Sequence, residues 1–148
     1  MKVKLMLSDE KYDRIAAELI AKGFEIDDDA EFILTERNFY ARHLIGRRGE
    51  EIFRLDTDKI SHIESLGHEG IAHSGGGEYR INERLRRLEE MLDPKRFLRV
   101  SNSVIVAVTE IKSVRPALSQ KFTLTMSDGS KVDVTRTYYY IFKEHFGI

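Results

Sequence analysis

Three histidines in the middle of the chain are the residues best suited by type to hold a metal ion. His68 and His73 lie five positions apart, so on one regular strand their side chains point to opposite faces. No HExxH motif, carboxylate pair or Cys accompanies them or His62. We therefore expect no metal site and no cofactor.

Other residues that could support catalysis have simpler structural explanations. Asp9 and the run Asp27–Asp29 would suit a phosphorylation or Mg²⁺ site, but their segment is too short for a doubly wound receiver domain, so we interpret them as a helix cap and a solvated turn. Gly75–Gly77 lacks the GxxxxGK[ST] frame of a phosphate loop and indicates a turn. Tyr138–Tyr140 can stack on bases, although core packing is favoured on a terminal helix. Because GxSxG-type nucleophile motifs are also absent from the sequence, we expect no enzyme.

Polar side chains that could contact nucleic acid stand where predicted strands end. His68 opens one strand, Asn102 interrupts two apolar strand segments, and Arg136 stands where a strand gives way to a helix. Arg can donate two parallel hydrogen bonds to guanine, and Asn can pair with adenine. Each residue also has an ordinary explanation, since Asn favours turns and an Arg near a helix start is usually solvated.

The N-terminal segment has the pattern of a small βαβ-like module. Residues 2–7 alternate as a strand, and Ser8 can cap a helix that Gly23 can terminate. Short strands are predicted at 24–26 and 32–34. We place a domain boundary at Arg48, giving a module over residues 1–48, with a dimerisation or regulatory role, and a second domain over 49–148.

The second domain is predicted to be mostly β. Apolar segments at 52–55, 60–63, 70–73, 97–100, 104–108, 122–126 and 131–134 are typical of strands. A helical stripe runs from Leu85 to Leu92, and a final helix carries Ile141 and Phe142. The predicted fold class is α+β with short helices.

Composition narrows the class of protein further. The chain has 148 residues, a formal net charge of −1 and no Cys, so a disulfide framework and a thiolate metal site are excluded. No apolar run is long enough for a membrane span, and we expect a soluble cytoplasmic protein. Residues 94–148 carry nine basic and four acidic side chains, which permits contact with phosphates.

From about Ile52 to Phe146 the chain resembles the LytTR family, the mostly β-stranded DNA-binding domain of bacterial transcription regulators. Five blocks carry the resemblance, in family order. They are Asp58-Lys59-Ile60-Ser61-His62-Ile63-Glu64, the helix Leu85–Leu92, Phe97-Leu98-Arg99-Val100-Ser101-Asn102-Ser103-Val104-Ile105-Val106, the hairpin Ser127-Asp128-Gly129, and Val134-Thr135-Arg136-Thr137-Tyr138-Tyr139.

The resemblance implies a multi-sheet β-sandwich whose loops enter successive major grooves. It assigns base contacts to His68, Asn102 and Arg136. Phosphate contacts would come from hydroxyl groups, namely Ser101, Ser103 and Thr137. Paired domains would read direct repeats in double-stranded DNA, so a homodimer is expected, with no small-molecule substrate. In short regulators without a receiver domain, control would not depend on phosphorylation, and a membrane-protein antagonist is an implied partner.

Three positions depart from the family pattern. The common His-Arg-Ser block is Ser101-Asn102-Ser103 here, Ala107 replaces an Asn, and Glu69 stands beside His68. The alternative hypothesis is therefore a protein-interaction module of the same fold without DNA binding. Salt dependence separates the two, because affinity for DNA falls steeply as salt rises.

Overall fold

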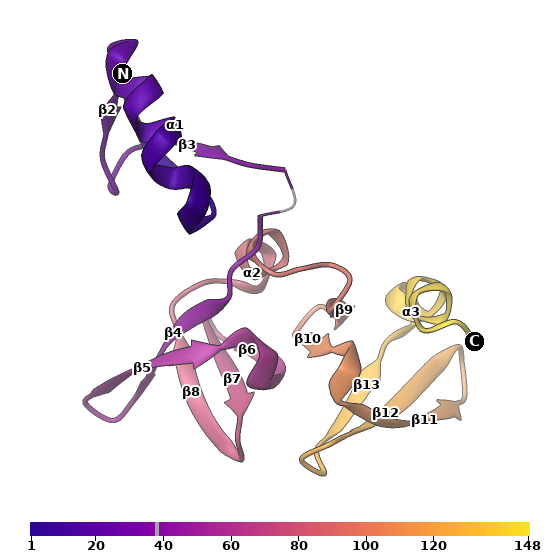
Figure 1. Cartoon of the computed structure of the whole chain (residues 1–148). Helices are drawn as coiled ribbons and strands as arrows, with labels where there is room; N and C mark the ends of the chain where they lie inside the picture. Colours follow the sequence, from indigo (N-terminus) through magenta and orange to yellow (C-terminus); the bar gives the residue numbers. More distant parts are fainter. Residues whose placement is uncertain (38) are drawn as a thin grey trace. The chain divides into compact units, whose positions relative to one another are not determined.

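The chain folds into two compact units, which the computed structural model describes over residues 1–37 and 39–148 (Figure 1). Unit 1 covers Met1–Phe39 and unit 2 covers Tyr40–Ile148. The division therefore falls before the predicted boundary at Arg48. The physical reason is that His43–Arg48 forms a strand, β4, which pairs along its length with the next strand of unit 2.

Unit 1 is a helix packed on a small parallel sheet. Its elements are β1 (Lys2–Met6), α1 (Asp9–Ala21), β2 (Glu25–Ile26) and β3 (Phe32–Thr35), with strand order β2-β1-β3. Alternation along β1 directs Val3 and Leu5 toward the stripe of α1 that includes Ile15 and Leu19. The predicted strand–helix–strand pattern is thus present in this segment.

Glu36 ties the end of β3 to the first turn of α1. Its carboxylate accepts a hydrogen bond from the Ser8 backbone N–H at 2.6 Å and one from Lys11 Nζ at 2.8 Å. The hydrogen bond from Lys11, followed by those from Ser8, lowers the pKa of Glu36 to about 2 from an ordinary value of 4.5. Both bonds are stronger to the ionised carboxylate than to the protonated carboxyl group, so folding favours the deprotonated form.

We expect the stability that Glu36 gives unit 1 to be present above about pH 4.5 and lost as the pH falls toward about 2, because its pKa is depressed in the folded state. Glu36→Gln should lower the thermal midpoint at neutral pH and remove this part of the acid dependence. Circular dichroism melts across the acid range measure both, with Glu31→Gln, an exposed carboxylate on the same segment, as the control. Superimposable pH profiles for wild type and Glu36→Gln would contradict the assignment.

Unit 2 is built on a seven-stranded sheet with strand order β5-β4-β8-β7-β6-β10-β9 (Figure 1). Its strands are β4 (His43–Arg48), β5 (Glu51–Asp56), β6 (Ile60–Leu66), β7 (Glu69–Ser74), β8 (Gly77–Ile81), β9 (Phe97–Ser101) and β10 (Val104–Ala107). The 3₁₀ turn η1 (Thr57–Lys59) joins β5 to β6, and α2 (Leu85–Met91) joins β8 to β9. Buried side chains of α2, including Leu88, pack with Ile63 and Ile105 to form the first core of this unit.

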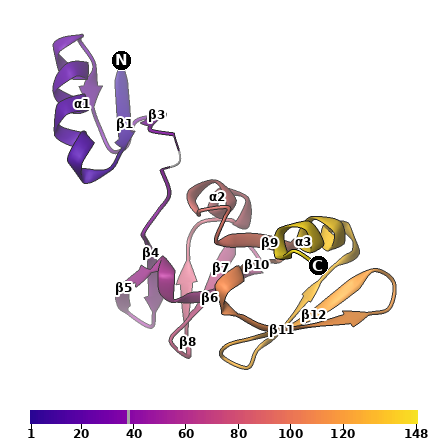
Figure 2. The ribbon, with the colours of Figure 1, turned by 45° about the vertical axis from the view of Figure 1, so that its right-hand side comes forward.

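A three-stranded antiparallel sheet with order β11-β12-β13 forms the second layer. Its strands are β11 (Ile111–Ala117), β12 (Lys121–Met126) and β13 (Lys131–Val134), preceded by the 3₁₀ turn η2 (Val108–Glu110). The turn η3 (Arg136–Tyr138) and helix α3 (Tyr139–Phe146) follow, with α3 beside this sheet in both views (Figures 1 and 2). Val100 and Val106 share the second core with Leu124 and Phe142.

Strands β9 and β10 therefore contribute to both cores, with Ile105 in the first and Val106 in the second. This arrangement confirms the predicted α+β, mostly β class and the multi-sheet sandwich. Among the described residues, none of the helices combines the length and apolar composition needed to span a bilayer.

Candidate nucleic-acid interface

Three loops of unit 2 gather at one end of its β-layers. Strand β10 pairs with β6 and β9, and the register Val104↔Glu64 brings the end of β6 beside the β9–β10 turn. The Ser65 backbone N–H donates to the Ser103 carbonyl at 2.7 Å. The Thr135 N–H, directly after β13, donates to the Val100 carbonyl at 3.0 Å. Because of these bonds, the β6–β7 turn, the β9–β10 turn and the start of η3 are held near one another.

His68 occupies the exposed tip of the β6–β7 hairpin. Gly67 precedes it with φ +64°, a conformation that L-residues rarely adopt and that lets the hairpin turn tightly. Glu69, the acidic neighbour noted in the sequence, lies 3.9 Å from Arg80 Nε across the β7–β8 pair. This exposed contact partly offsets the negative charge beside His68.

Asn102 is exposed in the β9–β10 turn and is oriented by two side chains. Its Oδ1 accepts a hydrogen bond from the Tyr138 hydroxyl at 3.3 Å, which ties the turn to η3. Its backbone carbonyl accepts from Arg99 Nη2 at 2.6 Å. The amide oxygen retains a second lone pair and the amide nitrogen two donors, so the group can still present a donor and an acceptor to a base edge.

Arg99 holds the β9–β10 turn from inside unit 2. Besides Asn102, it donates from Nε to the Ser101 carbonyl at 3.0 Å and from Nη1 to Glu89 Oε1 at 3.2 Å. These charge-assisted bonds connect the turn to α2. Arg99 is therefore a positioning residue, which the sequence pattern alone did not single out.

Arg99→Met should weaken DNA binding several-fold, because the β9–β10 turn loses the two hydrogen bonds that Arg99 donates to the carbonyls of Ser101 and Asn102, and its link to Glu89, while the aliphatic stem is kept. Fluorescence anisotropy measures the affinity. Arg87→Met is the matched control, since Arg87 pairs with Glu90 on the solvent face of α2. Equal affinities of the two variants would show that Arg99 does not position the turn.

The two serines of the β9–β10 turn differ in their surroundings. Ser101 is only 7% exposed, and its hydroxyl accepts from the Ser103 backbone N–H at 3.2 Å. The hydroxyl of Ser101 therefore helps to shape the turn, and its predicted contact with a phosphate stays a prediction. Ser103 is exposed, with its hydroxyl 3.3 Å from that of Ser101.

Arg136 and Thr137 are exposed at the first residues of η3. Arg136 forms no ion pair with any residue that the structure describes. Tyr138, two residues later, is half-buried and packs against the second core. The guanidinium of Arg136 is therefore displayed on an anchored segment.

A groove of about 550 Å³ beside the β6–β7 hairpin holds charged side chains to which the sequence analysis gave no function. Its lining includes Arg47, Arg48 and Arg80 together with Glu69 and Glu78. Arg47 and Arg80 stand directly opposite each other in the β4–β8 register, and Arg80 also lies 3.9 Å from Glu69. The arginines outnumber the glutamates, so the groove favours an anion only modestly. The adjacent arginines Arg47 and Arg48 are the sequence feature that could have indicated this groove, although their position favoured a domain boundary.

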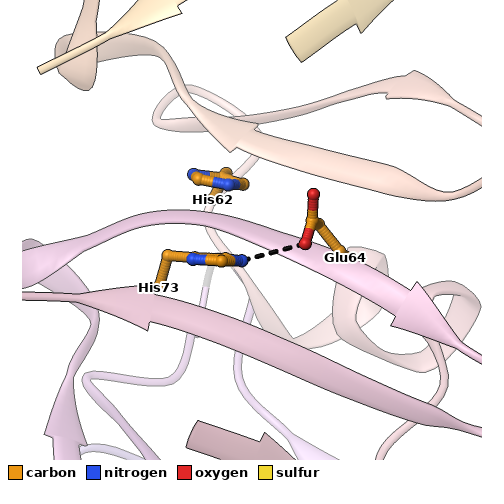
Figure 3. Close-up of side chains that lie close together, drawn as sticks. All are labelled: His62, Glu64 and His73. Atoms are coloured by element: carbon orange, nitrogen blue, oxygen red, sulfur yellow. Dashed lines mark hydrogen bonds and ion pairs between the residues drawn. The ribbon is translucent and has the colours of Figure 1, made fainter. Parts of the chain in front are cut away.

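The histidines meet in a way that single-strand spacing did not predict. His62 on β6 and His73 on β7 are directly opposite in register, with their rings stacked at a centroid distance of 4.0 Å (Figure 3). His73 Nε2 lies 2.9 Å from Glu64 Oε2. Burial lowers the pKa of His62, and the adjacent His73 lowers it further, which favours the neutral imidazole. His68 is not part of this group. The prediction that no metal site is present compared spacings along one strand, whereas these three side chains come from two strands.

The fold and these loops define a class of protein domain, a β-layered module whose strand-end loops gather at one end. Residues 50–147 match the LytTr DNA-binding domain family. The chain belongs to this family, which is a DNA-binding domain of transcription regulators rather than a class of enzymes.

Comparisons with individual proteins agree with this assignment. The chain is 32% identical over 114 residues to the sensory transduction protein LytT of Bacillus subtilis, an alignment that covers 73% of this chain and 46% of LytT. It is 30% identical over 93 residues to the transcriptional regulatory protein LytR of Staphylococcus aureus, covering 61% and 38% respectively. The chain thus matches less than half the length of either relative.

A solved LytTr DNA-binding domain of a putative methyl-accepting/DNA response regulator from Bacillus cereus shares the fold with a TM-score of 0.70. The match covers 73% of this chain and 99% of that domain at 21% identity. At this identity the likeness concerns the fold alone.

Proposed function

We propose that this chain is a transcription regulator that binds double-stranded DNA sequence-specifically through His68, Asn102 and Arg136. The observation that carries the proposal is the set of backbone hydrogen bonds that holds their three loops at one end of unit 2. Binding to DNA would place the protein in the cytoplasm of a bacterial cell.

The side chains suit base edges in the major groove. The guanidinium of Arg136 can donate to O6 and N7 of guanine, and the amide of Asn102 can pair with N6 and N7 of adenine. His68, at the hairpin tip, can donate or accept according to its tautomer. Because three separate loops carry these groups, their contacts would fall on more than one stretch of groove.

Phosphate contacts would position the domain without specifying sequence. Ser103 and Thr137 are exposed hydroxyls next to Asn102 and Arg136. Arg47 and Arg80, which face each other beside the His68 hairpin, would add positive charge near the DNA, partly balanced by Glu69 and Glu78 in the same groove.

The proposal for the whole chain includes paired domains on a direct repeat, as the family resemblance implies. Unit 1 would mediate the homodimer, with Phe32 and Ile33 on β3 as exposed apolar side chains available for contact. The same proposal includes a membrane protein as a partner that would oppose the activity of this regulator.

Selection from a random pool of double-stranded DNA tests the proposal. We expect enrichment of two short elements in the same orientation, spaced by about one helical turn of 10–10.5 base pairs. Sedimentation of the complex measures whether two chains bind each selected site. A pool that stays unenriched would contradict sequence-specific binding and favour a protein-interaction module.

A further inference from the structure

The stacked histidines of β6 and β7 form, with Glu64, a group of ligands that the proposed DNA contacts do not use. His62 and Glu64 are two residues apart on β6 and share one face of the sheet, and His73 stands opposite His62 on the neighbouring strand. One ligand atom from each of the three lies within 4.8 Å of the others. We propose that His62, Glu64 and His73 bind a divalent transition-metal ion, with Zn²⁺ the best fit.

Two imidazoles and a carboxylate are a donor set that Zn²⁺ accepts readily. Tetrahedral zinc with bonds of about 2.0–2.1 Å needs ligand atoms roughly 3.3 Å apart. His73 Nε2 and Glu64 Oε2, at 2.9 Å, are already this close, so it is the ring nitrogen of His62 that must approach them. The rings lie nearly parallel at 9°, and their nitrogen lone pairs point along parallel planes (Figure 3). Rotation of one ring about its Cβ–Cγ bond directs the two lone pairs toward a common point. The backbone pairing of β6 with β7 does not need to change.

The surroundings supply a further oxygen donor. Glu78 Oε1 on β8 lies 3.9 Å from His73 Nδ1. This carboxylate can complete the coordination sphere, or water can occupy the open position as in catalytic zinc sites.

The burial of His62 also favours a metal ligand role for this histidine. His62 is 1% exposed, and among the described residues its ring nitrogen contacts only the Ser61 hydroxyl, at 3.1 Å. Its cross-strand partner on the other side, Val106, belongs to the second core. A position of this kind could be filled by an apolar side chain, whereas an imidazole there gains from a metal bond that replaces its lost hydration.

Zinc titration of the full chain after removal of metal by a chelator tests the inference. Isothermal titration calorimetry should show one Zn²⁺ per chain, with a rise in the thermal midpoint because the ion binds the folded state. His73→Gln and Glu64→Gln each remove a ligand and should weaken binding on the order of 100-fold or more, since even outer-shell partners contribute 10–100-fold. His145→Gln is the matched control, as it removes a surface imidazole on α3 and should bind zinc as wild type does.

Circular dichroism checks that each variant is folded. If His73→Gln does not fold, Glu64→Gln still tests the inference, because Glu64 is partly exposed and its substitution disturbs the core less. Failure of the folded wild type to bind stoichiometric Zn²⁺ would overturn the inference. Unchanged zinc affinity in Glu64→Gln and His73→Gln would do the same and leave the Glu64–His73 pair as a structural contact. Neither result depends on DNA, so the proposed function is tested separately.

Discussion

Arg136→Ala is expected to remove most of the preference of the protein for its selected DNA site over a shuffled site. A bidentate Arg–guanine contact contributes about 1–3 kcal/mol of discrimination, which corresponds to a roughly five- to 140-fold change in the ratio of the two dissociation constants. Fluorescence anisotropy on the two DNAs measures this ratio. Asn102→Ala should reduce it by a similar factor through the loss of its adenine contact.

Arg54→Ala is the matched control for Arg136→Ala. Arg54 is an exposed arginine on β5, which lies at the edge of the seven-stranded sheet opposite β9. Its removal lowers the positive charge of the domain by the same amount, so both variants lose non-specific affinity. If Arg136→Ala discriminates between the two DNAs as well as Arg54→Ala does, Arg136 does not contact a base.

Phe142→Ala should produce the largest loss of stability in unit 2. Phe142 is fully buried in the second core. Its ring centroid lies 5.4 Å from the ring centroid of Phe122 and 5.3 Å from that of Phe146. Truncation of a buried Phe removes apolar contacts and leaves a cavity, at a cost of about 3–5 kcal/mol. Urea unfolding followed by circular dichroism measures the free energy of unfolding. DNA binding should weaken as well, since α3 anchors the segment that carries Arg136.

Phe146→Ala provides the comparison within the same helix. Phe146 is 36% exposed in the last turn of α3, so its truncation opens less of the core and should cost clearly less than Phe142→Ala. Equal losses for the two variants, or a loss below about 1 kcal/mol for Phe142→Ala, would contradict the view that α3 closes the second core.

Elements with a strong apolar period were predictable from the sequence. Alternation at Val3 and Leu5 predicted β1, and the apolar residues at helical spacing in 85–92 predicted α2. Strand β4 was missed because one of its two inward positions is Gly46. A Cβ there would lie 2.7 Å from Leu55 Cδ1 and 2.9 Å from Tyr79 Cβ, so close packing excludes an apolar side chain and removes the alternation from the sequence.

Strand β11 lacked the pattern for a different reason. It is an edge strand with an exposed outer side, and it accommodates Pro116 because a proline at an edge interrupts no interior hydrogen bond. Its pairing with β12 is set by the packing of the second sheet, which local sequence does not encode.

The individual residues of the candidate site could be predicted from the sequence, but their proximity in space could not. Asn102 and Arg136 stood out as polar residues at strand ends, yet their proximity depends on the bonds from Tyr138 to Asn102 and from Thr135 to Val100. The meeting of His62 and His73 depends on the β6–β7 register, which contains an irregularity between Ile60 and His62. Register across strands is a tertiary property, so spacing along one strand could not reveal it.

The most direct test of DNA binding by unit 2 is the affinity of the full chain for its selected repeat and for a shuffled repeat over a salt series. We predict that the logarithm of both affinities falls linearly with the logarithm of salt concentration, since phosphate contacts release counterions. The preference for the selected repeat should persist across the series, because base contacts release few ions. Equal affinity for the two DNAs at every salt concentration, or no binding at low salt, would contradict the account.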